Sequence, residues 1–235
     1  MIRHYLLVDD NEAFAENLAE ILRDTGAEVD IALDGLQAIE RVKVRRYDAL
    51  VTDMRMPGMN GAELLRELRK IDGELPAVLL SAYSQEDLLR MARRDGLLAV
   101  LSKPQQIPRL IQILDSARRG GAVVLVEDDI ALADNLSEAL ASRGLTAVTA
   151  ADVKELGRVS ARPFAVLVDL KLPDAGFGEA LQRVHERWPG IPTIVMTAFR
   201  DEAQAAGAQE CFFKPFDTAT VLNRLEVLYR EYQPT

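Results

Sequence analysis

The sequence contains a single cysteine, no hydrophobic run long enough for a membrane-spanning helix, and no excess of basic residues. The lone Cys211 cannot form a disulfide within the chain, and such scarcity is typical of a protein in a reducing cytoplasm. No apolar segment approaches the roughly 20 residues that cross a bilayer, and the first residues lack the pattern of a secretory signal. We therefore expect a cytoplasmic protein without a membrane partner.

The shortage of basic charge applies to both halves of the chain. The formal net charge is −9 over 235 residues. Residues 1–119 carry 17 basic and 20 acidic side chains, and residues 120–235 carry 11 basic and 17 acidic side chains. A nucleic-acid-binding domain is expected to be basic, so this balance predicts no nucleic-acid partner. The composition, 49% hydrophobic and 28% charged, is that of a soluble globular protein.

What the sequence does contain is a set of short apolar runs that end in carboxylates. Residues 6–10 read Leu-Leu-Val-Asp-Asp, and residues 49–53 read Ala-Leu-Val-Thr-Asp. Runs of this length fit strands that are buried on both faces of a parallel sheet. A charge that leaves water is costly unless it is paired or bound to a metal, so acids at these positions indicate a site. The pattern recurs at residues 123–128 and 165–169.

Polar landmarks repeat in one order along the two halves. Their separations are 118, 116, 116 and 111 residues for Asp10 and Asp128, Asp53 and Asp169, Ser81 and Thr197, and Lys103 and Lys214. So constant an offset predicts a duplicated domain rather than an array of short repeats. We place the two domains at residues 1–119 and 120–235. The interval from the hydroxyl residue to the lysine is 22 residues in the first half but 17 in the second. The five missing residues would shorten the helix near 201–206, which is therefore predicted to be a stub or absent.

Strand and helix patterns alternate five times in each half. Strands are expected near 4–8, 28–32, 49–53, 77–81 and 98–101, and then near 122–126, 145–149, 164–168, 192–196 and 210–213. Helices are expected near 12–24, 35–44, 62–70, 85–94 and 103–118, and then near 130–142, 152–159, 178–187, 201–206 and 217–231. Five such units predict an α/β fold, with two tandem (βα)5 doubly wound parallel sheets of flavodoxin-like order 2-1-3-4-5.

In this strand order the first and third strands are neighbours, and their carboxyl ends flank the ligand-binding edge. Two acid clusters should therefore form there: Asp9, Asp10 and Asp53, and Glu127, Asp128 and Asp169. Three carboxylates that repel one another favour a divalent cation, and hard oxygen ligands suit Mg²⁺ or Mn²⁺. A hydroxyl and an ammonium at the next two strand ends can hold an oxyanion, as phosphoryl transfer requires. These groups belong to Ser81 and Lys103, and to Thr197 and Lys214.

Both halves resemble the receiver domain of two-component response regulators, and together they cover nearly the whole chain. In the first half the matching motifs are Val8-Asp9-Asp10, Asp53 followed by Met56-Pro57-Gly58 and Gly61, Ser81-Ala82, and Lys103-Pro104. In the second half they are Val126-Glu127-Asp128, Asp169 followed by Leu172-Pro173-Asp174, Thr197-Ala198, and Lys214-Pro215-Phe216. Each motif is weak alone, but eight of them in order at the expected strand ends are specific.

The resemblance implies a role for each of these positions. It implies phosphoryl acceptors at Asp53 and Asp169, which would take the group from a phosphohistidine on a histidine kinase or phosphotransfer protein. It implies that Asp10 and Asp128 bind Mg²⁺ directly and that Asp9 and Glu127 assist, through water. The backbone carbonyls of Arg55 and Lys171 would be further ligands. It also implies contact of the acyl phosphate with Ser81, Thr197, Lys103 and Lys214, and cis peptides at Lys103-Pro104 and Lys214-Pro215.

The sequence departs from the family pattern in two respects. The family places a switch aromatic three residues before the lysine, where this chain has Val100 and Cys211. The glycine of the loop after the acceptor also differs between the halves. Gly61 lies eight residues after Asp53, whereas Gly176 and Gly178 lie seven and nine residues after the acceptor of the second half.

The leading hypothesis is a phosphorelay signalling protein, with no enzymatic activity beyond its own dephosphorylation, that acts on a downstream protein partner. No residues remain after the last predicted helix for an output domain, so the output is expected to be a protein contact or onward phosphate transfer. In one alternative, one half of the chain, preferably the second, is a scaffold that binds partners without being phosphorylated. Formation of a homodimer is also left open. A Mg²⁺-dependent phosphatase of the haloacid dehalogenase type is disfavoured, because its nucleophile lies after the first strand. A flavodoxin-like flavin protein is also disfavoured, because this sequence lacks the hydroxyl-rich phosphate-binding loop that such a protein has after its first strand.

Overall fold

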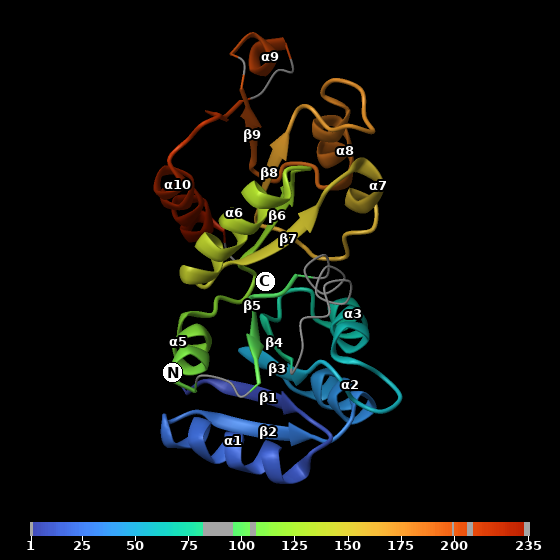
Figure 1. Ribbon diagram of the computed structural model, residues 1–235, viewed down its shortest axis with the longest axis vertical. Coiled ribbons are helices and arrows are strands. Elements are labelled where there is room, and N and C mark those ends of the chain that lie inside the picture. The colour runs from blue at the N-terminus through green and yellow to red at the C-terminus, as the bar shows by residue number, and fades with distance from the viewer. Residues whose placement is uncertain (1, 82–95, 104–106, 199, 206–208, 233–235) are drawn as a thin grey trace. The chain divides into compact units, whose positions relative to one another are not determined.

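A computed structural model of the chain describes residues 2–81, 96–103, 107–198, 200–205 and 209–232 (Figure 1). The chain divides into two compact units, Met1–Gly120 and Gly121–Thr235. Each unit contains one five-stranded sheet in which all neighbouring strands are parallel. Among the described helices, none is both long enough and apolar enough to cross a bilayer.

The first unit has the strand order β2-β1-β3-β4-β5. Its strands are β1 (His4–Val8), β2 (Glu28–Ala32), β3 (Ala49–Asp53), β4 (Ala77–Ser81) and β5 (Ala99–Ser102). Its described helices are α1 (Glu12–Asp24), α2 (Gly35–Val44), α3 (Gly61–Ile71) and α5 (Ile107–Ser116). The helix predicted near residues 85–94 lies outside the described residues.

The second unit has the strand order β10-β9-β8-β6-β7. Its strands are β6 (Ala122–Val126), β7 (Thr146–Ala150), β8 (Ala165–Asp169), β9 (Thr193–Thr197) and β10 (Cys211–Phe213). Its described helices are α6 (Ile130–Ser142), α7 (Val153–Leu156), α8 (Glu179–Arg187), α9 (Arg200–Ala205) and α10 (Thr218–Glu231). The predicted order 2-1-3-4-5 is therefore confirmed in both units.

Alternate residues of each buried strand supply the cores on the two faces of a sheet, because successive side chains of a strand point in opposite directions. In β6, Val124 and Val126 pack in one cluster with Leu181 of α8. Val123 and the intervening Leu125 pack in a second cluster with α6 and α10. Helices thus cover both faces, and the continuous apolar run of β6 is explained by burial on both sides.

Two predicted helices of the second unit are short in the structure. The helix expected over 152–159 was predicted too long, because α7 ends at Leu156 and Gly157 follows as its C-terminal cap. Gly157 still has helical backbone angles, with φ −61° and ψ −21°, but the helix ends there after a single turn. The helix expected as a stub near 201–206 is α9, which has six residues.

The join between the units is held on each side by backbone hydrogen bonds within the adjacent unit. The Gly120 amide donates to the Glu74 carbonyl at 3.2 Å, and Arg119 pairs with Asp72 at 2.7 Å. The Thr146 amide donates to the Gly121 carbonyl at 2.8 Å. Hydrogen bonding within each unit therefore extends to the two adjacent glycines.

Candidate functional site

The predicted site residues of the first unit meet at the carboxyl edge of its sheet. Val8 of β1 pairs with Thr52 of β3, so Asp9 and Asp53 follow at the ends of neighbouring strands. On the other side of β3, β4 ends at Ser81, whose carbonyl accepts a 2.7 Å hydrogen bond from the Lys103 amide. The strand register alone thus brings two acids, a hydroxyl and an ammonium to one edge.

Lys103 links the two buried acids of this edge. Its Nζ lies 2.7 Å from Oδ2 of Asp9 and 2.7 Å from Oδ1 of Asp53, and 4.4 Å from the ring centroid of Phe14. Burial by itself would lower the pKa of Lys103, but the hydrogen bonds and charges of the two acids outweigh it. The pKa therefore lies above its ordinary value of 10.5, and the side chain is a cation at neutral pH.

Backbone amides hold the second oxygen of each acid. The Asn11 amide donates to Oδ1 of Asp9 at 3.0 Å, and the Arg55 amide donates to Oδ2 of Asp53 at 2.8 Å. Hydrogen bonds of this kind stabilise the charged form of a carboxylate. Asp10, the third predicted acid, is exposed beside them.

The second unit repeats this arrangement with a glutamate in place of the first aspartate. Lys214 Nζ lies 2.7 Å from Oε2 of Glu127 and 2.6 Å from Oδ2 of Asp169. The Asp129 amide donates to Glu127 Oε1 at 3.3 Å, and the Lys171 amide donates to Asp169 Oδ1 at 2.9 Å. The same lysine clamp therefore occurs at the corresponding edge of both sheets.

Burial sets the ionisation behaviour of this second cluster. Glu127 is only 3% exposed, and this burial raises the pKa of its carboxyl even though Lys214 acts to lower it. For Lys214, burial would lower the pKa, but hydrogen bonds to Asp169 and Glu127 raise it above its ordinary value of 10.5. The cluster is a buried, mutually dependent set of charges, as is typical of functional sites.

The acids of the second unit also meet the spacing that a metal ion requires. One carboxylate oxygen each from Glu127, Asp128 and Asp169 lie within 4.8 Å of one another. Carboxylate oxygens are the ligands that Mg²⁺ and Mn²⁺ prefer, so the donor set fits such a cation. Within the described parts of the chain, Asp9, Asp10 and Asp53 do not form so compact a set. The ligand role predicted for the backbone carbonyls of Arg55 and Lys171 stays a prediction.

The two predicted hydroxyl residues are buried at the ends of β4 and β9. Ser81 is 7% exposed and Thr197 is 2% exposed. Thr197 Oγ1 donates a hydrogen bond of 2.9 Å to Oε2 of Glu202 in α9. The other oxygen of Glu202 lies 2.5 Å from Nζ of Lys171. The sequence analysis did not identify Glu202, although an acid follows the hydroxyl by five residues in both halves, as Glu86 and Glu202.

The loop after the acceptor requires a glycine in both units, but for a different structural reason in each. The Gly61 amide donates to the Met54 carbonyl at 3.0 Å, and a Cβ at Gly61 would lie 2.3 Å from the Asp53 carbonyl oxygen. In the second unit the corresponding hydrogen bond runs from the Gly178 amide to the Leu170 carbonyl at 3.4 Å. Gly178 has a positive φ of 72° and open space around its missing Cβ. The altered spacing thus replaces a close approach with a left-handed turn.

The Lys214-Pro215 peptide bond is cis, as the family resemblance implies. The corresponding Lys103-Pro104 bond includes Pro104, which lies outside the described residues.

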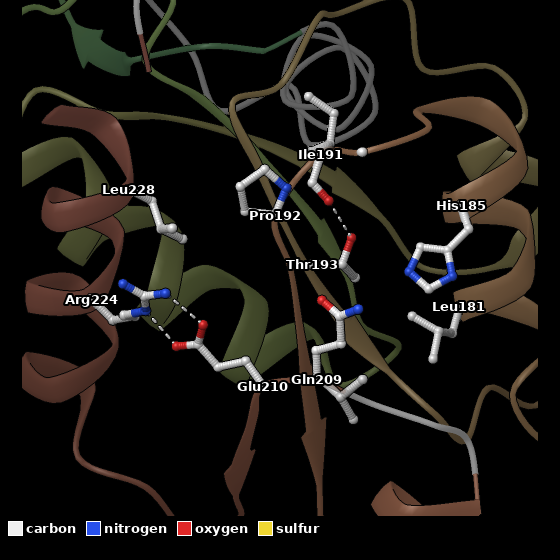
Figure 2. A pocket seen from close by; sticks show the side chains of 11 residues that line it. Leu181, His185, Ile191, Pro192, Thr193, Gln209, Glu210, Arg224 and Leu228 are labelled. Carbon is white, nitrogen blue, oxygen red and sulfur yellow. Dashed lines mark hydrogen bonds and ion pairs between the residues drawn. The ribbon is translucent and has the colours of Figure 1, made fainter. Parts of the chain in front are cut away.

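A cavity of about 600 Å³ lies at the opposite, amino-terminal edge of the second sheet. Figure 2 shows Arg224 of α10 paired with Glu210, the residue before β10, at 2.5 Å and 2.9 Å. His185 and Leu181 of α8 line another side of this cavity. Since none of its lining residues belongs to the acid cluster, this cavity is separate from the candidate site.

Comparison with known proteins gives a consistent result for both halves. A sequence model of the response regulator receiver domain matches residues 5–115 and again residues 123–226. A response regulator receiver protein of Anaeromyxobacter sp. (strain Fw109-5) is 52% identical over 231 residues, which are 98% of this chain and 97% of that protein. Sporulation initiation phosphotransferase F of Bacillus subtilis (strain 168) is 31% identical over 105 residues, which are 45% of this chain and 85% of that protein.

Solved structures with a related fold each cover about half of the chain. The chemotaxis protein CheY4 of Vibrio cholerae is 26% identical, with a TM-score of 0.47 over 49% of this chain and 98% of that chain.

Proposed function

The chain belongs to the family of response regulator receiver proteins, and from this premise we propose that Asp53 and Asp169 accept phosphoryl groups in a phosphorelay. We assign one receiver domain to residues 1–119 and the other to residues 120–235, a boundary one residue from the division into compact units between Gly120 and Gly121. The observation that carries the proposal is the lysine clamp that both units share. In each, a buried aspartate at the end of the third strand is paired with a lysine at 2.6–2.7 Å.

The transfer step exchanges one bond to phosphorus for another. A carboxylate oxygen of Asp53 or Asp169 attacks the phosphorus of a phosphohistidine. The bond from phosphorus to the imidazole nitrogen breaks, and the nitrogen keeps the electron pair while the ring carries a proton, so that it leaves as neutral imidazole. The product is an aspartyl phosphate and a histidine, with no change in oxidation state. Such a transfer requires mainly positioning and neutralisation of charge.

The residues around each acceptor supply these two requirements. Lys103 and Lys214 already contact the acceptor carboxylates, so each ammonium is placed to pair with a phosphoryl oxygen after transfer. Ser81 and Thr197 end the adjacent strand, where a hydroxyl can donate to a second phosphoryl oxygen. Their burial excludes water and strengthens each of these interactions.

We propose that Mg²⁺ or Mn²⁺ binds beside each acceptor. In the second unit the ligands would be Glu127, Asp128 and Asp169, with the Lys171 carbonyl, and the spacing of the three acids supports this. In the first unit they would be Asp9, Asp10 and Asp53, with the carbonyl of Arg55. When bound, the cation would neutralise the charge that accumulates on the phosphoryl oxygens.

The partners follow from this chemistry. A histidine kinase or a phosphotransfer protein would supply the phosphoryl group, and the phosphotransferase named among the relatives supports such a relay. Signalling would proceed through a downstream protein partner, with no nucleic acid or membrane bound.

We also propose a cytoplasmic location, since the single cysteine suits a reducing compartment. The compact acid set of the second unit favours an active second acceptor over a scaffold role for that half.

The proposal is tested by incubation with acetyl phosphate and Mg²⁺, followed by intact-mass spectrometry. Each phosphoryl group adds about 80 Da. We expect up to two additions on the wild type, at most one on Asp53→Asn or Asp169→Asn, and none on the double variant. Asp115→Asn, a change at an exposed aspartate of α5, is the matched control and should behave as the wild type. Absence of any addition, or an undiminished addition on the double variant, would overturn the proposal.

A further inference from the structure

Glu202 joins two groups that flank the acceptor of the second unit. Its Oε2 accepts a 2.9 Å hydrogen bond from the buried hydroxyl of Thr197, and its Oε1 lies 2.5 Å from the Lys171 ammonium. Thr197 is the last residue of β9, and the residue before it, Met196, pairs with Asp169 on the adjacent strand β8. Lys171 follows Asp169 by two residues and donates its amide to that carboxylate. One glutamate therefore engages side chains on two sides of the acceptor.

We propose that Glu202 is a positioning residue that restrains Thr197 and Lys171 in the unphosphorylated protein and so slows phosphorylation of Asp169. This inference rests on the proposed function of Asp169 as an acceptor. The hydroxyl must turn its hydrogen from Glu202 to a phosphoryl oxygen, and the hydrogen bond to Glu202 opposes that rotation.

The hydrogen bond has a fixed direction because only one partner can donate. The Oε1 oxygen of Glu202 lies 2.5 Å from the Lys171 ammonium, an ion pair that holds the side chain as a carboxylate. A carboxylate accepts hydrogen bonds and donates none. A hydroxyl has a single hydrogen to donate, so the bond to Glu202 and a bond to a phosphoryl group exclude each other.

The ion pair to Lys171 adds a second restraint on the same site. The Lys171 backbone amide contacts the acceptor carboxylate at 2.9 Å, so its long, cationic side chain starts beside the place where new negative charge would form. Glu202 holds this ammonium at 2.5 Å and brings a further negative charge to that side of the site. A phosphoryl group that contacts Thr197 and Lys171 would have to take both partners from Glu202, and its negative charge would be repelled by that carboxylate.

The sequence of the first half contains the same set of residue types. Arg55 follows Asp53 by two residues, as Lys171 follows Asp169, and Glu86 follows Ser81 by five residues, as Glu202 follows Thr197. Glu86 lies outside the described residues. The repeat is a second reason to assign the acid a function rather than a chance surface contact.

The test measures the rate at which acetyl phosphate modifies Asp169 in an Asp53→Asn background. We expect Glu202→Gln to raise this rate about fivefold, on the order of one partly exposed, charge-assisted hydrogen bond. The control is Glu226→Gln on α10. Glu226 is 17% exposed against 19% for Glu202, and it pairs with Arg143 at 2.5 Å. The control, in the same background, should leave the rate within about twofold of that of the Asp53→Asn parent.

A double-mutant cycle with Thr197→Val shows whether Glu202 acts through the hydroxyl. The acceleration by Glu202→Gln should shrink markedly when Thr197 is already valine, because contacting residues are coupled. A loss of helix stability alone would instead give the same factor in both backgrounds. If Glu202→Gln folds poorly, Glu202→Asp replaces it, because the shorter side chain cannot reach both partners.

Two kinds of failure are distinguishable in this experiment. If Asp169 is modified at the same rate in the Asp53→Asn parent with and without Glu202→Gln, the inference is wrong while the proposed function stands. If Asp169 is modified in no variant, including Glu202→Gln, both the inference and the acceptor role of that residue are wrong.

Discussion

The Lys214 ammonium lies 2.6 Å from Oδ2 of Asp169, and the same contact is repeated between Lys103 and Asp53 at 2.7 Å in the first unit. In both units the lysine also contacts the first buried acid of the cluster, at 2.7 Å. The resting site is thus an ion cluster in which one cation is shared between two carboxylates. A phosphoryl group or a metal ion entering the site would exchange these contacts for new ones of the same electrostatic kind.

Removing the shared cation should destabilise the second unit. Lys214→Met leaves Glu127 and Asp169 buried without their ion pair, and we expect a loss of about 3 kcal/mol in the free energy of unfolding at pH 7. Urea denaturation of the second unit's transition measures this loss. The change Lys154→Met at an exposed lysine of α7 is the control and should cost less than about 0.5 kcal/mol.

The pH dependence of this loss follows from the direction of the pKa shifts. Burial raises the pKa of Glu127, so the cost of its unpaired charge is largest above that pKa and declines as pH falls and the carboxyl is protonated. The raised pKa of Lys214 matters at alkaline pH. The stabilising contribution of the Lys214 side chain is complete below pH 10.5 and is lost as pH rises through the folded-state pKa. An equal loss at pH 5 and pH 7 would contradict this account.

Magnesium binding should raise the unfolding temperature of the chain. A ligand that binds only the folded state stabilises it by roughly 2.7 kcal/mol at one hundred times its dissociation constant. We expect Asp128→Asn to reduce the increase, because it removes a ligand from the compact acid set. Calorimetric scans with MgCl2, and with KCl at matched ionic strength, measure the effect. An undiminished increase in a chain that carries both Asp10→Asn and Asp128→Asn would argue against the predicted sites.

The two loop glycines should respond differently to alanine. A Cβ on Gly61 would lie 2.3 Å from the Asp53 carbonyl oxygen, so Gly61→Ala must displace the strand end that carries the acceptor. Gly178→Ala meets no atom but places alanine at a φ of 72°, which costs about 1–2 kcal/mol. We expect a larger loss of stability for Gly61→Ala, and slower phosphorylation of Asp53 in that variant. Equal effects on stability in chemical denaturation would contradict the assigned close approach.

Two buried tyrosines should give the first unit an alkaline limit of stability. Burial raises the pKa of Tyr5 to about 12, with a smaller contribution from Asp115. Burial also raises the pKa of Tyr47 to about 12, together with its 2.7 Å hydrogen bond to Asp30. The unfolded chain ionises first, near the ordinary value of 10.0, so stability is lost as pH rises from 10 to 12.

Phenylalanine at either position removes the titrating group while keeping the ring. Tyr5→Phe and Tyr47→Phe should each flatten the loss of stability between pH 10 and pH 12, by an amount on the order of 2 kcal/mol. Ultraviolet absorbance of tyrosinate, compared between the wild type and each variant, gives the two pKa values directly. Values near 10 for both residues would show that the phenols are not protected in the folded state.

Much of the fold could be predicted from the sequence because its strands are buried on both faces. The run from Val123 to Val126 has no polar residue to place on a solvent side, so burial and strand length decide its structure. The same logic places Asp53 and Asp169 at strand ends. Helix α7 was less predictable, because the apolar residue Val159 continues a helical spacing that Gly157 has already ended.

The details of the site depended on geometry that spacing alone does not fix. The sequence offers Gly176 and Gly178 as alternatives, and only the backbone hydrogen bond from Gly178 to Leu170 distinguishes them. Glu202 reaches Thr197 because α9 begins three residues after the end of β9, which brings residues five apart into contact. A charged residue on a short helix gives no pattern in the sequence that would set it apart from a solvated one.

The hydrogen bonds at Gly120 and Gly121 bear on how the two receivers can be separated by cloning. Because one glycine completes the bonding of the first fold and the next glycine begins that of the second, the peptide bond between them is the natural cut. A fragment ending at residue 118 would discard the Arg119 pair with Asp72, and one starting at residue 122 would discard the carbonyl bound by Thr146. Reporter insertions or protease sites should accordingly go between these two glycines.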